Sequence, residues 1–120
     1  MPERLVELDL EERGEVVVAR VTGELDIAES EQTGHAIAAR VDASALGLVV
    51  DFTGLSFIDS SGIAMLFRLV RQLSSRRQAL RVAVLPGGPV ARVLELVEFE
   101  RAAGVDSDVA AAVAAVEAAR

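Results

Sequence analysis

The 120-residue chain is predicted to fold as one α/β domain, a mostly parallel β-sheet of four to five strands with an antiparallel N-terminal strand and about four helices. Three observations lead to this prediction. Apolar runs of strand length alternate with segments of helical periodicity, and the strand-like runs are rich in β-branched residues. The length suits a single domain, so residues 1–120 are expected to form one unit.

The N-terminal half predicts a hairpin, a helix and a buried strand. Apolar residues alternate loosely with charged ones over residues 5–10, and a β-branched run follows Gly14 over residues 16–22. Residues 28–41 are weakly amphipathic, as in a surface helix. Residues 46–50 are continuously apolar, which is typical of a strand covered on both faces.

The C-terminal half continues the alternation. Residues 62–74 have strong helical periodicity, and residues 80–85 predict another buried strand. Pro89 suits the first turn of a third helix that extends to Val97. A short strand is expected within residues 102–105, followed by a terminal helix that the acidic residues before it would cap.

The connection between the buried strand and the second helix is the candidate site. It is predicted to be an eight-residue loop, residues 52–59, at the carboxyl edge of the sheet, where functional sites gather. Asp59, Ser60 and Ser61 stand at the helix start, where capping alone would explain them. A phosphate on Ser60 would also suit the positive end of the helix dipole, adding about −1.5 to −2 charges. Gly62 would leave both serines open to a partner.

The same residues carry a family resemblance. The run from Leu55 to Ile63 reads L-S-F-I-D-S-S-G-I and resembles the Asp-Ser-Ser/Thr-Gly signature of STAS domains, in particular the bacterial anti-sigma factor antagonists. The upstream G-E-L-D of residues 23–26, the V-V-D of residues 49–51 and the Ala-rich terminal helix fit the same family. The resemblance implies a regulatory binding protein that is not an enzyme and needs no cofactor.

The resemblance also implies a mechanism and partners. When unphosphorylated, antagonists of this family bind an anti-sigma factor that is also a serine kinase, and so release a sigma factor. The kinase phosphorylates the serine after the aspartate, which maps to Ser60, and a serine phosphatase reverses the change. Asp26 and Asp59 match acidic positions at or near the partner surface, and Ser61 matches the family's following Ser or Thr. The alternative within the fold is a non-catalytic STAS scaffold subunit of a stress-signalling or lipid-transport complex.

Charge predicts further contacts and excludes some partners. The net charge of −7 argues against direct binding of nucleic acid or an anionic membrane. Residues 60–94 nevertheless hold six Arg and no acid, which is either a solvated face or a partner surface. We expect Arg68 and Arg71, one turn apart on the exposed side of the second helix, to contact an acidic partner. The predicted partner-binding set is therefore Asp26, Asp59, Ser60, Ser61, Gly62, Arg68 and Arg71.

Catalysis, metal binding and membrane insertion find little support in the sequence. The chain has no Cys and a single His, His35, which is expected on the solvent side of the first helix, so a nucleophile would lack a base. No acidic cluster has calcium-loop spacing, and no metal site is predicted. The longest uncharged apolar run has ten residues, too few for a membrane span, and the acidic N-terminus lacks an export signal. A cytoplasmic location is the expectation.

Overall fold

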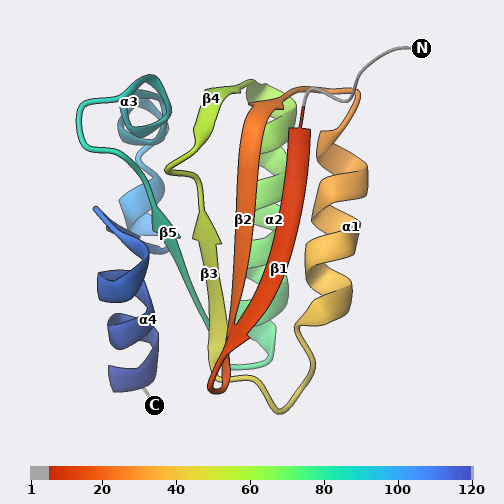
Figure 1. Cartoon of the computed structure of the whole chain (residues 1–120), viewed down its shortest axis with the longest axis vertical. Coiled ribbons are helices and arrows are strands. Elements are labelled where there is room, and N and C mark those ends of the chain that lie inside the picture. The colour runs from red at the N-terminus through yellow and green to blue at the C-terminus, as the bar shows by residue number, and fades with distance from the viewer. Residues whose placement is uncertain (1–5, 120) are drawn as a thin grey trace.

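The computed structural model describes residues 6–119, and Leu5 of the predicted first strand lies outside this range. Within this range, four helices and six strands follow one another in the order expected from the alternating patterns, apart from one additional strand (Figure 1). They are β1 (Val6–Arg13), β2 (Val16–Leu25), α1 (Ser30–Arg40), β3 (Gly47–Asp51), β4 (Leu55–Ile58), α2 (Ser60–Ser75), β5 (Ala79–Ala83), α3 (Pro89–Leu96), the 3-10 turn η1 (Phe99–Arg101), β6 (Gly104–Asp106) and α4 (Val109–Ala118).

The strands form one mixed sheet, which confirms the predicted fold class. Its order is β1-β2-β3-β5-β6, and β4 pairs with β2 off this path. Among the strands of residues 6–119, only β1 runs antiparallel to its neighbour, as the hairpin pattern predicts. At one edge, β1 alternates exposed acids with inward apolar residues, and at the other edge β6 is three residues long.

The predicted strand number of four to five is wrong, because the supposed loop of residues 52–59 contains β4. β3 ends at Asp51, and after a short turn Leu55 resumes pairing with Gly23 of β2. A register shift between Gly23 and Glu24 then aligns Phe57 with Glu24. The segment is a strand because the end of β2 extends beyond β3 and offers backbone groups for pairing. This cause lies in the tertiary structure, so the four residues of β4 do not reveal it by themselves.

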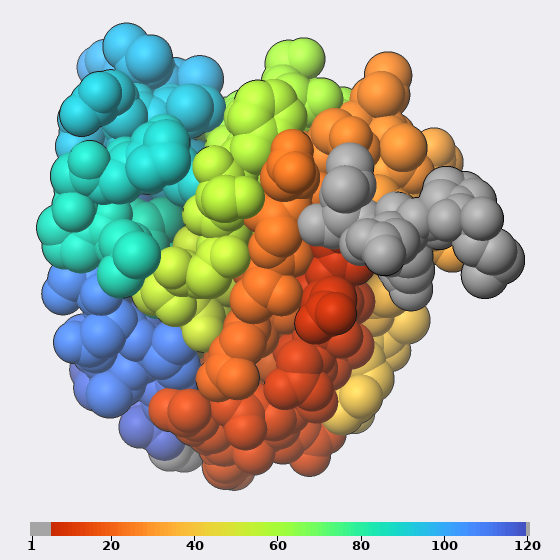
Figure 2. Space-filling view, turned by 45° about the horizontal axis from the view of Figure 1, so that its top comes forward, coloured from red at the N-terminus to blue at the C-terminus, as the bar shows by residue number. Residues whose placement is uncertain are grey.

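Helices cover both faces of the sheet. Along β2, Val17 and Ala19 belong to the larger core shared with α1 and α2, whereas Val16 and Val18 face α4, as the two-residue period of a strand requires. α3 contacts β4 and joins the larger core. In the space-filling view, β2 and the β3–β4 segment form a band between β1 on one side and α3 and α4 on the other (Figure 2). Among the described residues, no helix has both the length and the apolarity needed to cross a bilayer.

Candidate functional site

Asp59 organises the N-terminus of α2. It is the N-cap residue in an extended conformation, and its backbone N–H donates to the carbonyl oxygen of Leu25 at 3.2 Å. Its Oδ1 accepts from the backbone N–H of Ser61 at 2.9 Å and of Gly62 at 3.1 Å, and from the Ser61 hydroxyl at 2.5 Å. One carboxylate oxygen thus satisfies two of the orphan amides at the helix start, and the backbone N–H of the same residue attaches the turn to β2.

Ser61 links the starts of the two neighbouring helices. Its hydroxyl also lies 3.2 Å from Oγ of Ser30, the first residue of α1. The Ser30 hydroxyl donates in turn to the carbonyl oxygen of Asp26 at 2.7 Å. The carboxylate of Asp26 is partly exposed and accepts from the backbone N–H of Ala28 at 3.0 Å. Each hydroxyl has one proton, which Ser61 donates to Asp59 and Ser30 donates to Asp26, so the two hydroxyl oxygens are in polar contact without a proton between them. The β2–α1 connection and the start of α2 therefore lie side by side, and each is held by the hydrogen bond of its own serine.

Ser60 differs from Ser61 in its exposure and in the hydrogen bonding of its hydroxyl, two properties that affect whether an enzyme can modify a serine. It is the first residue of α2 and is exposed, whereas Ser61 is partly buried. Within residues 6–119 its hydroxyl forms no hydrogen bond, while the Ser61 hydroxyl donates to the Asp59 carboxylate and contacts the Ser30 hydroxyl. An incoming enzyme would reach the Ser60 hydroxyl without breaking any interaction of the fold.

The Asp59 carboxylate is held in its charged form. The hydroxyl of Ser61 is the main cause that lowers the pKa of Asp59 below the ordinary 3.8, and the backbone N–H groups of Gly62, Ser61 and Ile27 contribute less. Partial burial opposes this lowering of the pKa. Because hydrogen bonds to the ionised form favour it, the site keeps a fixed negative charge beside Ser60 at neutral pH.

Gly62 is packed against the core beneath the two serines and is not exposed to solvent. It is buried, and a Cβ at this position would come within 2.6 Å of Cγ1 of Ile58 and 3.3 Å of Cγ of Leu25. The missing side chain therefore allows α2 to begin close against β4 and the end of β2. Its predicted contribution to partner binding stays a prediction.

The remaining predicted residues extend from this point along α2. Arg68 lines a hollow of about 390 Å³ between the start of α1 and the first half of α2, together with Ile27 and Ser61. Arg71 is exposed one turn further along the same helix. The fold thus gathers five of the predicted residues at the carboxyl end of β2 and the start of α2: Asp26, Asp59, Ser60, Ser61 and Gly62. Arg68 flanks this group, and Arg71 is more distant.

Two apolar side chains near the site were missed by the sequence reasoning. Ile27 is 81% exposed in the β2–α1 connection, and Phe57 is 46% exposed on β4, three residues before Ser60. Exposed large apolar residues close to a functional loop are typical of contact surfaces. The available signal was their position beside two motifs, G-E-L-D and D-S-S-G, but exposure itself requires the fold.

The described residues show no arrangement suited to metal binding. No group of three or more His, Asp or Glu side chains among them could hold an ion. His35 is exposed on α1. What the site offers is a capped helix start that presents one free hydroxyl, two nearby carboxylates and a flanking arginine.

The fold and the site together define a small mixed-sheet α/β domain that presents a serine at the start of a capped helix. The STAS domain family model matches residues 7–112, and the chain belongs to this family. A comparison with curated protein sequences finds no significant match.

Solved structures agree with this assignment. The structure of an anti-sigma factor antagonist from Mycobacterium paratuberculosis is similar in fold, with a TM-score of 0.84 and 23% identity over 93% of this chain and 94% of that one. The anti-sigma factor antagonist SpoIIAA in its unphosphorylated form is 27% identical over 86% of this chain and 90% of that one, with a TM-score of 0.66. Phosphorylated SpoIIAA from Bacillus is also 27% identical, over 92% and 99%, with a TM-score of 0.68.

Proposed function

We propose that this protein is an anti-sigma factor antagonist switched off by phosphorylation of Ser60. In its unphosphorylated state it binds an anti-sigma factor with serine kinase activity and so releases a sigma factor. The observation that carries the proposal is the free, exposed hydroxyl of Ser60 at the first position of α2, next to a serine whose hydroxyl is already engaged. Similarity to SpoIIAA, which has structures in both phosphorylation states, supports it.

The switch acts through surface chemistry. A phosphate on Ser60 meets the positive end of the α2 dipole, so the helix tolerates it. The same phosphate places about two negative charges beside the ionised Asp59 and near the apolar side chains of Ile27 and Phe57. A partner that buries these apolar groups would have to strip water from the phosphate, which opposes docking.

The proposed partner surface includes the seven residues predicted from the sequence. Asp26, Asp59, Ser60 and Ser61 form its centre, the buried Gly62 supports this centre from beneath by letting α2 begin close to β4, and Arg68 and Arg71 extend it toward an acidic region of the anti-sigma factor. The protein acts in the cytoplasm without contacting nucleic acid or crossing a membrane, it catalyses nothing itself, and a serine phosphatase restores its active state.

The decisive experiment combines partner capture with phosphosite mapping. The protein is isolated from its native cells with its bound partners, and mass spectrometry identifies the partners and locates any phosphate. An ATP-binding serine kinase together with phosphate on Ser60 is the expected result. Phosphate on Ser61 alone would contradict the assignment, and recovery of membrane-transport subunits instead would favour a scaffold role.

Variants then test the switch with the identified partner. Ser60→Ala should bind the anti-sigma factor persistently in the presence of ATP, whereas Ser60→Asp should bind weakly. Ser74→Ala is the matched control, because Ser74 is an exposed serine at the other end of the same helix. Equal affinities of Ser60→Ala and Ser60→Asp would rule out a charge-based switch.

A further inference from the structure

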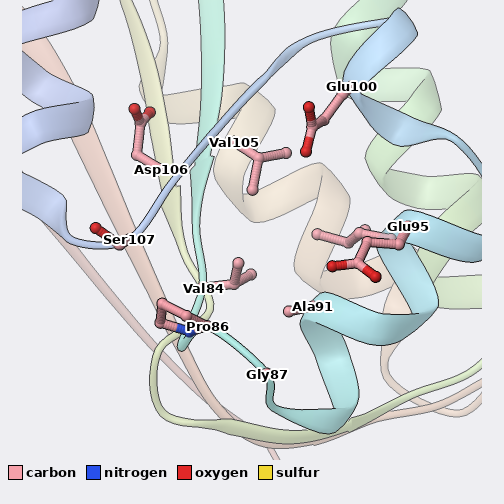
Figure 3. A pocket seen from close by; sticks show the side chains of 10 residues that line it. Val84, Pro86, Gly87, Ala91, Glu95, Glu100, Val105, Asp106 and Ser107 are labelled. Carbon is pink, nitrogen blue, oxygen red and sulfur yellow. The ribbon is translucent and has the colours of Figure 1, made fainter.

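A second candidate site lies at the carboxyl ends of β5 and β6. A cavity of about 230 Å³ opens there, and none of its lining residues belongs to the Ser60 site (Figure 3). Val84, Pro86 and Gly87 follow β5 on one side, and Val105, Asp106 and Ser107 come from β6 and the residue after it. The two segments are joined where the N–H of Val84 donates to the carbonyl oxygen of Asp106 at 3.0 Å.

The topology makes this place a natural crevice. After β5 the chain enters α3, whose buried Val90 and Leu94 join the larger core with α1 and α2. After β6 it enters α4, whose Ala112 and Val116 form the smaller core on the opposite face of the sheet. In open α/β sheets, ligands bind outside the carboxyl ends of adjacent strands whose connections leave to opposite faces.

The lining combines an apolar floor with unpaired negative charge. Val84, Ala91 and Leu94 are buried beneath the cavity. Glu95 on α3 and Glu100 on η1 are exposed, and in Figure 3 their carboxylates lie on the same side of the space, across from Pro86 and Ser107.

Neither glutamate is neutralised by the part of the chain that the structure describes. Within residues 6–119, Glu95 and Glu100 have no ion-pair partner. The third acid, Asp106, differs because its Oδ2 accepts from Nε of Arg81 at 2.7 Å. The cavity therefore presents two uncompensated carboxylates above apolar side chains, which favours a ligand with a positive head and an aliphatic body.

We propose that this cavity binds a short alkyl chain ending in a guanidinium or ammonium group, either free in solution or as an Arg or Lys side chain of another protein. The volume is below the roughly 300–1,000 Å³ of pockets for drug-sized ligands, so the occupant is small. Its methylenes pack on Val84, Ala91 and Leu94, and its cation lies between Glu95 and Glu100. A guanidinium fits best, since its planar fork matches carboxylates in bidentate geometry. This site does not depend on the function proposed for Ser60.

The test is an NMR titration of the ¹⁵N-labelled protein with n-butylguanidinium. We expect saturable shifts at the amides of Gly87, Glu95 and Ser107. The neutral probe n-butanol, which has the same alkyl chain, should bind at least about tenfold more weakly because it lacks the charge-assisted contacts. Absence of saturable shifts up to tens of millimolar n-butylguanidinium would overturn the proposal, as would equal binding of n-butanol.

Charge variants separate a specific site from general attraction to an acidic protein. Glu95→Gln/Glu100→Gln should weaken n-butylguanidinium binding at least about tenfold. The control Glu7→Gln/Glu12→Gln removes two exposed acids from β1, at the opposite edge of the sheet, and should leave binding unchanged. If both double variants weaken n-butylguanidinium binding equally, the binding depends only on the net charge of the protein, and the proposed site is refuted.

A final comparison identifies the source of the cation. A blocked Gly-Gly-Arg-Gly-Gly peptide that binds at least as tightly as n-butylguanidinium assigns the cavity to a side chain of a protein partner. Binding of n-butylguanidinium without binding of the peptide assigns it to a small free cation. Either result supports the proposed chemistry.

Discussion

Replacement of Gly62 by Ala is expected to destabilise the protein, although Ala normally favours helices. The new methyl group would lie 2.6 Å from Cγ1 of Ile58 and 3.3 Å from Cγ of Leu25, and both of these residues are buried. Overpacking of a core costs about 1–3 kcal/mol, and the gain in helix propensity returns at most about 1 kcal/mol. We therefore expect the free energy of unfolding to fall by about 1–2 kcal/mol.

Urea unfolding followed by circular dichroism measures this change. Ala64→Gly, at an exposed position in the next turn of α2, reports the propensity difference without the clash. Ile58→Ala removes the two atoms that the new methyl would approach most closely, Cγ1 and Cδ1 of Ile58, so Gly62→Ala should cost much less in that background. A Gly62→Ala variant more stable than the parent would refute the reasoning, and so would an equal cost in both backgrounds.

Three further predictions concern the hydrogen bonds at the start of α2 and the ion pair between β2 and β3. Ser61→Ala should lower the free energy of unfolding by about 1 kcal/mol because it loses the hydrogen bond to the Asp59 carboxylate and the contact with the Ser30 hydroxyl, whereas Ser60→Ala should stay within about 0.5 kcal/mol of the parent. Because folding lowers the pKa of Asp59, its contribution to stability is present above the ordinary 3.8 and is lost as the pH falls through the lowered value. The difference in free energy of unfolding between the parent and Asp59→Asn should therefore change only in that acidic range. Arg20→Met should cost about 1 kcal/mol, because it removes the ion pair at 3.3 Å from the Asp51 carboxylate, which is only 3% exposed.

Each of these predictions has a clear contrary outcome in unfolding experiments. Equal losses for Ser60→Ala and Ser61→Ala would show that the two hydroxyls do not differ in their bonding. A parent-to-Asp59→Asn difference that changes near neutral pH would contradict the cause given for the pKa. Unchanged stability of Arg20→Met would mean that the buried carboxylate is satisfied by the hydrogen bonds that it accepts from the backbone N–H and the hydroxyl of Thr53.

The long periodic elements could be predicted from the sequence because the spacing of their apolar residues shows which faces of the helix or strand are buried. α2 buries one face of a 16-residue helix, and β3 is buried at all five positions, so residue order alone reports which sides are covered. β4 gives no such signal. Within Leu55–Ile58 only the two end residues are buried, and the strand exists because β2, some thirty residues earlier, extends past the end of β3.

In the candidate site, too, local features could be predicted from the sequence, whereas contacts between distant residues could not. The motif identifies Asp59 as a helix cap, which a local pattern can predict, and the structure confirms the cap. The contact between the Ser61 and Ser30 hydroxyls could not be predicted, since Ser30 lies 31 residues before Ser61 in the sequence. The burial of Gly62 likewise depends on Ile58 and Leu25, which only the folded chain brings against it.

The two outer strands of the sheet have a consequence for the behaviour of the protein at high concentration. Unpaired strand edges can template pairing with other chains, which leads to aggregation. β1 carries the exposed acids Glu7, Asp9 and Glu11, so two such edges repel each other, and β6 offers only three residues for pairing. Charge at one edge and brevity at the other thus protect a chain that is 52% hydrophobic from assembling edge to edge.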